Sequence, residues 1–87
     1  MAVETWLCAR LIKRNNKHKI RKGISFYQND LGWCKLRTDA GKDQWLTSVE
    51  EMHTLIDRWL LQGYEWQGEC NLPTEITSRH SLIDEET

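Results

Sequence analysis

The sequence predicts an α+β domain in which an antiparallel sheet of four to five strands packs against one amphipathic helix. Segments of alternating apolar and polar residues, separated by turn-forming residues, fill the first half of the chain. A capped segment with helical periodicity follows at residues 48–62. The 87 residues can build one such core and leave no room for a second.

The strands are expected in five segments: residues 3–14, 19–28, 33–38 and, more briefly, 44–46 and 64–70. Asn, Asp and Gly cluster in the gaps between them, as tight turns require. Alternation in the first segment predicts two faces. One face carries Val3, Thr5, Leu7, Ala9 and Leu11, and the other carries Trp6, Cys8, Arg10 and Ile12.

The helix is expected to begin at Ser48, whose hydroxyl can cap the backbone of Glu51 while that carboxylate reaches back. Thr47 and Glu50 offer the same pattern one residue earlier. The apolar residues of the helix share one stripe, which predicts a core-facing side: Val49, Met52, Leu55, Ile56, Trp59 and Leu60. Gly63 is expected to end the helix.

The compact domain is expected to span residues 1–72, because Pro73 interrupts the pattern and polar residues follow it. Residues 73–87 finish with Asp84-Glu85-Glu86, so a flexible acidic tail is the preferred interpretation. The alternative is that Ile76 and Leu82 dock as a short linear segment.

Charge divides the chain although the net charge is only −1. Residues 1–42 hold ten basic and three acidic side chains, which gives +7, whereas residues 43–87 hold two basic and ten acidic side chains, which gives −8. Two interpretations follow. Either the basic half folds onto the acidic half and neutralises it, or the protein has two faces of opposite sign, one of them for a polyanion or an acidic partner.

A basic hairpin is the first candidate binding surface. Its residues lie on either side of the expected turn at Asn15-Asn16: Lys13, Arg14, Lys17, Lys19, Arg21 and Lys22. Such a cluster suits nucleic-acid phosphates, because each neutralised phosphate releases a condensed counterion. The alternative is a solvated turn whose lysines protect the sheet edge against pairing with other chains.

Trp33, Lys35 and Arg37 form the second candidate surface, because alternation puts them on the sheet face opposite Cys34 and Leu36. A ring flanked by cations can stack on a base or contact a side chain of a protein partner. The alternative is that the N-terminal strand covers Trp33.

No catalytic, metal or cofactor site is expected. The cysteines form no C-x-x-C pair and no histidine lies three or four residues from a cysteine, so a metal site would have to be assembled by tertiary contacts. The glycines are isolated at turns, which excludes a phosphate-binding loop. His53 could meet Cys8 or Cys34 as the base for a thiol, but a packed, neutral histidine is the preferred interpretation.

We therefore expect a small, non-enzymatic interaction protein that binds and modulates a protein partner, of the kind common among accessory proteins of phages and mobile elements. The alternative is a nucleic-acid-binding module that uses the basic hairpin. No membrane is expected, because no apolar run exceeds four residues and the start lacks a signal-peptide pattern. No small-molecule substrate is expected either. The odd cysteine count predicts a cytoplasmic location. The order of the expected elements, strands followed by one amphipathic helix, is similar to that of the arm-site DNA-binding domains of phage integrases. The two share no residue motif.

Overall fold

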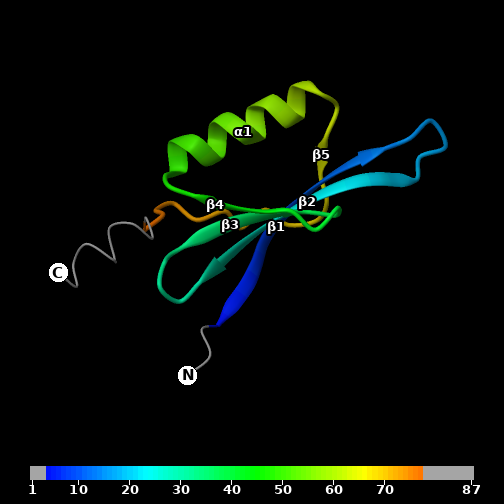
Figure 1. The fold of residues 1–87 in the computed structure, drawn as a ribbon. Coiled ribbons are helices and arrows are strands. Elements are labelled where there is room, and N and C mark those ends of the chain that lie inside the picture. Colours follow the sequence, from blue (N-terminus) through cyan, green and yellow to red (C-terminus); the bar gives the residue numbers. More distant parts are fainter. Residues whose placement is uncertain (1–3, 78–87) are drawn as a thin grey trace.

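A computed structural model of the chain, which describes residues 4–77, confirms the α+β fold. One antiparallel sheet of five strands has the order β4-β3-β2-β1-β5, and the single helix α1 lies across one of its faces (Figure 1). The bounds of the elements are β1 Thr5–Arg14, β2 Ile20–Asn29, β3 Cys34–Thr38, β4 Asp43–Leu46, α1 Val49–Leu61 and β5 Glu65–Trp66. No helix among residues 4–77 is long and apolar enough to cross a membrane.

The core lies between α1 and the sheet. Leu11 of β1, Phe26 of β2 and Met52 of α1 are fully buried there, with 0% of each residue exposed. Cys34 and Leu36 of β3 point to the same side, as alternation predicts. Apolar residues at alternating strand positions and at helical spacing therefore meet in one layer, and the face of the sheet away from α1 stays uncovered (Figure 1).

The predicted faces of β1 are wrong because of a β-bulge at Cys8. Leu7 pairs with Tyr27 and Ala9 pairs with Phe26, so one extra residue separates these two positions of β1. Ala9 lies under α1 beside Phe26, and Leu7 lies on the opposite face with 52% of its surface exposed. Side chains alternate between the two faces only within a regular strand. The residues of β1 expected on one face therefore divide between both faces at the bulge.

The start of α1 is capped as the sequence predicts, with one difference. The Ser48 hydroxyl accepts a hydrogen bond from the Glu51 amide over 3.1 Å. The Glu51 carboxylate accepts from the Thr47 amide over 3.2 Å, and the Thr47 hydroxyl also donates to it. The expected return bond to the Ser48 amide is therefore shifted by one residue, and this contact lowers the pKa of Glu51.

The end of α1 positions two aromatic rings. Gly63 has φ of 99°, and the Tyr64 amide donates to the Trp59 carbonyl over 3.1 Å, which forms a Schellman motif. The ring centroids of Trp59 and Tyr64 are 6.4 Å apart. Leu60, expected in the core stripe, is 39% exposed, whereas its neighbour Trp59 packs against the core.

The chain continues against the sheet beyond the expected boundary at Pro73. Backbone amides of Gln67 and Asn71 donate to carbonyls of β1, and the Thr77 amide donates to the Gly32 carbonyl over 2.8 Å. Ile76 packs against the core. Residues 78–87, including Leu82 and the acidic end of the expected tail, lie outside the described residues.

Candidate functional site

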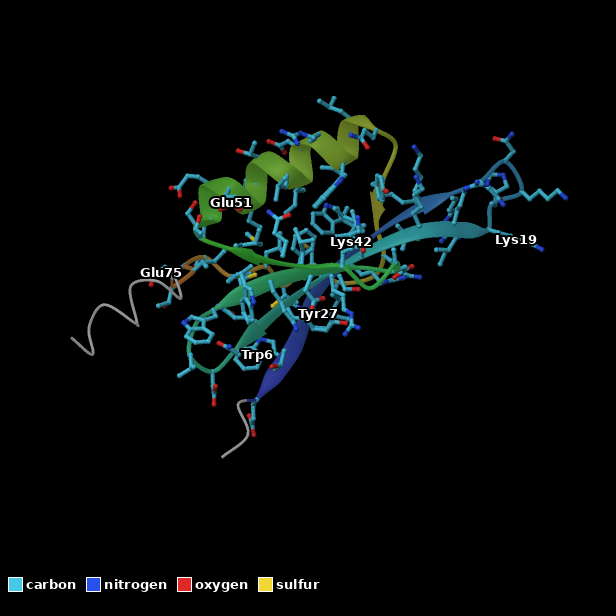
Figure 2. The ribbon with its side chains drawn as sticks, viewed as in Figure 1. Trp6, Lys19, Tyr27, Lys42, Glu51 and Glu75 are labelled. Atoms are coloured by element: carbon cyan, nitrogen blue, oxygen red, sulfur yellow. The ribbon has the colours of Figure 1, made fainter. Side chains whose placement is uncertain are left out.

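The open face of the sheet carries a continuous row of side chains across four strands. Cross-strand pairing aligns one residue from each strand, and we name this set the aromatic row: Leu7, Tyr27, Lys35 and Trp45. Figure 2 shows Tyr27 on the side of the sheet away from α1. Leu7 and Trp45 are exposed, at 52% and 37% of their surface. An open face of a two-layer domain is usually polar, so this row is unusual.

Trp33 extends the aromatic row just before β3 begins. Its ring meets Trp45 edge to face at 86°, with the centroids 5.8 Å apart, and this is a favourable arrangement of two aromatic quadrupoles. The Lys35 ammonium lies 5.6 Å from the Trp45 centroid and 3.5 Å from an Asp43 carboxylate oxygen. The rings are therefore held in place by neighbouring groups while one side of the row faces solvent.

The space beside the aromatic row is small. A cleft of about 40 Å³ is lined by Tyr27, Trp33 and Trp45, among other residues. This volume admits about one water molecule, far below the several hundred Å³ typical of ligand pockets. The row is a surface on which another surface can pack, and it offers no enclosed small-molecule site.

A second row on the open face is charged, and Arg10 of β1 lies at one end of it. The Arg10 guanidinium donates to both carboxylate oxygens of Asp39 over 3.0 and 3.1 Å and to the Ser25 hydroxyl over 2.8 Å. Gly23 makes this arrangement possible, because a Cβ at this position would overlap the guanidinium and lie 2.6 Å from the Asp39 carboxylate. Asp43 lies 3.5 Å from Arg37 at the other end of the row, so these charges are largely satisfied within the protein.

The basic hairpin connects β1 to β2 and extends beyond the other strands (Figures 1 and 2). The Asn15 side chain accepts backbone hydrogen bonds from Lys17 and Lys19, and His18 adopts φ of 60°, so the turn has a defined geometry. Arg14 forms an ion pair with Glu65 over 2.8 Å. Within residues 4–77 no ion pair involves the remaining cations of the turn: Lys17, Lys19, Arg21 and Lys22.

The structure therefore separates the nine predicted site residues into two groups, one on the hairpin and one on the open face of the sheet. The hairpin holds six of them. Trp33 and Lys35 lie on the open face near the β2–β3 turn, and Arg37 lies on the same face at the other end of β3, in the charged row. Three residues of the aromatic row were missed by sequence reasoning: Leu7, Tyr27 and Trp45. Alternation does put Tyr27 and Lys35 on outward positions, but Leu7 joins them only because of the bulge.

The thiols and histidines form no reactive set in the described part of the chain. Cys8 and Cys34 are buried, and burial raises the pKa of both thiols, that of Cys34 to about 12. His53 is exposed on α1, so the interpretation as a packed core histidine is wrong. Among residues 4–77 no group of three His, Cys, Asp or Glu side chains could hold a metal ion.

Comparison with protein-family models, curated proteins and solved structures gives no match. The two surfaces just described, the aromatic row and the basic hairpin, must therefore carry the functional argument.

Proposed function

We propose that this protein is a non-enzymatic interaction protein that binds a protein partner through the aromatic row on the open face of its sheet. The single observation that carries the proposal is the alignment of Leu7, Tyr27, Lys35 and Trp45 across four strands, extended by Trp33. The partner modulation and the cytoplasmic location expected from the sequence remain parts of this proposal.

The composition of the row supports a protein partner. Tyrosine and tryptophan are enriched at the centres of protein interfaces, because rigid rings give a large contact area at a small cost in side-chain entropy. Leu7 adds exposed apolar surface beside them, and the ammonium of the ion-paired Lys35 lies over the Trp45 ring. Aromatic and apolar side chains thus predominate in the row, with one ion-paired cation among them, and aromatic residues are typical of protein interfaces.

The chemistry of the partner follows from the patch. Apolar side chains of the partner would pack against Leu7 and the exposed part of Trp45, and a carboxylate of the partner would complement Lys35 and Arg37. The charged groups would contribute orientation and association rate more than affinity, because Asp43 already satisfies part of their charge.

The test is affinity capture from the cells in which the chain is naturally made, with quantitative detection of the captured proteins. The bait variant Leu7→Ser/Trp45→Ala removes the exposed apolar side chains at the two ends of the row. Leu61→Ser is the matched control, because Leu61 is 90% exposed on α1, on the other side of the sheet. A partner should be retained by the wild type and the control and reduced about tenfold or more by the row variant. Equal recovery by all three baits would contradict the proposal, and so would capture of additional copies of the chain alone.

A further inference from the structure

A groove of about 540 Å³ opens on the helix side of the sheet, at the end away from the aromatic row. It lies where α1 stops and the β1–β2 hairpin continues, and Figure 2 shows Lys42 between the helix and the sheet at this end. Its walls combine apolar side chains with cations: Ile24, Trp59 and Tyr64, and Arg21, Lys22 and Lys42.

Charge in and around the groove is strongly positive. No acidic residue occurs between Glu4 and Asp30, a stretch that includes the whole hairpin. Within the described residues Lys42 forms no ion pair, like four of the hairpin cations: Lys17, Lys19, Arg21 and Lys22. Asp39 is the acidic side chain in the groove wall, and its carboxylate is bound to the Arg10 guanidinium.

The aromatic rings give the groove a second property. Trp59 and Tyr64 are tilted by 50° to each other and are only partly buried, so parts of both rings border the groove. The Lys13 ammonium lies 5.8 Å from the Tyr64 centroid, which places a cation beside a ring at the junction with the hairpin. Cations that follow a backbone and rings on which bases stack are the two elements of single-strand recognition.

We propose that the hairpin and this groove bind single-stranded nucleic acid, with phosphates along the hairpin cations and an unpaired base against Trp59 and Tyr64. A polyanion fits the hairpin because the cations of the hairpin are close together and have no acidic neighbours in the sequence. A single strand fits the groove because its bases are free to enter, whereas duplex bases are held in the stack. The site is separate from the aromatic row, so this inference does not depend on the proposed function.

The test is fluorescence anisotropy with a labelled oligothymidylate of about 16 nucleotides, which covers the usual site sizes of such modules. A duplex of the same length and a polyglutamate of similar charge serve as competitors. If four phosphates are neutralised, affinity should fall about 50-fold between about 50 and 200 mM salt. Changing Lys17, Lys19, Arg21 and Lys22 to Gln should remove most of this salt dependence. Lys35→Gln/Arg37→Gln, on the open face, should leave binding unchanged.

A second variant separates the groove from the hairpin. Tyr64→Leu should weaken oligothymidylate binding about fivefold or more without changing its salt dependence, because stacking is lost and the phosphate contacts remain. Tyr64→Phe keeps the ring and should bind like the wild type. Circular dichroism establishes that each variant is folded. The inference is overturned by absent binding at low salt, by tighter binding to the duplex, by polyglutamate that competes as well as the single strand, or by a Tyr64→Leu variant that binds normally.

Discussion

Replacing Gly23 with alanine should destabilise the protein for a reason that lies entirely on the open face of the sheet. A Cβ at this position would overlap the Arg10 guanidinium and lie 2.6 Å from an Asp39 carboxylate oxygen. Arg10 would have to move, and its hydrogen bonds to Asp39 and Ser25 would be lost or weakened. Gly23 has no positive φ, so backbone strain does not contribute.

The magnitude follows from two opposing effects. Hydrogen bonds to a charged group are each worth about 1.5–3 kcal/mol when buried, and the partial exposure of Arg10 and Asp39 reduces the loss to about 2–3 kcal/mol in total. Alanine in a strand interior is favoured over glycine by about 0.5–1 kcal/mol through backbone entropy. Gly23→Ala should therefore lower the free energy of unfolding by about 1–2 kcal/mol.

The decisive assay is a double-mutant cycle measured by urea denaturation. In an Arg10→Ala background the guanidinium is absent and the exposed Asp39 is free to turn away, so Gly23→Ala should stabilise the protein by about 0.5–1 kcal/mol. The effect of the same substitution should thus change sign with the residue at position 10. Destabilisation of equal size in both backgrounds would refute the reasoning.

Three other substitutions or treatments test the core, the helix cap and the thiols. Phe26→Ala should lower the free energy of unfolding by about 3–5 kcal/mol in the same assay, because the ring is fully buried between α1 and the sheet. The hydrogen bond from Thr47 lowers the pKa of Glu51 in the folded state. The ionised carboxylate therefore stabilises the fold at any pH above the pKa that Glu51 has in the unfolded chain. This stabilisation is lost as the pH falls through the folded-state pKa of Glu51. Glu51→Gln should therefore be destabilising near neutral pH and nearly neutral in acid, and thermal melts across this range would show it; a difference independent of pH would contradict the assignment. Of the thiols, Cys70 should react at once with a disulfide reagent and Cys34 only on unfolding, because Cys70 is exposed and burial raises the pKa of Cys34 to about 12.

Much of the fold could be predicted because its signals are local. The helix was expected over residues 48–62 and occupies Val49–Leu61, since the Ser48 cap and the Gly63 stop are both set by nearby residues. Strands β2 and β3 begin and end within about one residue of expectation for the same reason: the Asn-rich and Gly-containing turns mark their ends.

The errors come from features that depend on contacts between distant segments. The bulge at Cys8 follows from the pairing of β1 with β2, and neither strand alone encodes it. Ile76 packs against the core far from it in the sequence, and the composition of this segment does not indicate that contact.

Some features of the candidate site could also be predicted from local sequence, and others depend on contacts between distant segments. The hairpin cations and the outward direction of Lys35 and Arg37 follow from spacing in the sequence. The aromatic row does not, because it requires the register of three strand pairs and the bulge that turns Leu7 outward. The positions of Trp59 and Tyr64 beside a basic groove require the end of α1 to be placed over the sheet.

The most direct test of a protein-binding open face is photo-crosslinking in the cells in which the chain is naturally made. A photoreactive amino acid at position 7 lies in the aromatic row, and the same group at position 61 lies on the exposed side of α1. Our account predicts a covalent adduct between the chain and a second protein from position 7 and none from position 61. Adducts from position 61 alone, or identical adducts from both positions, would contradict it.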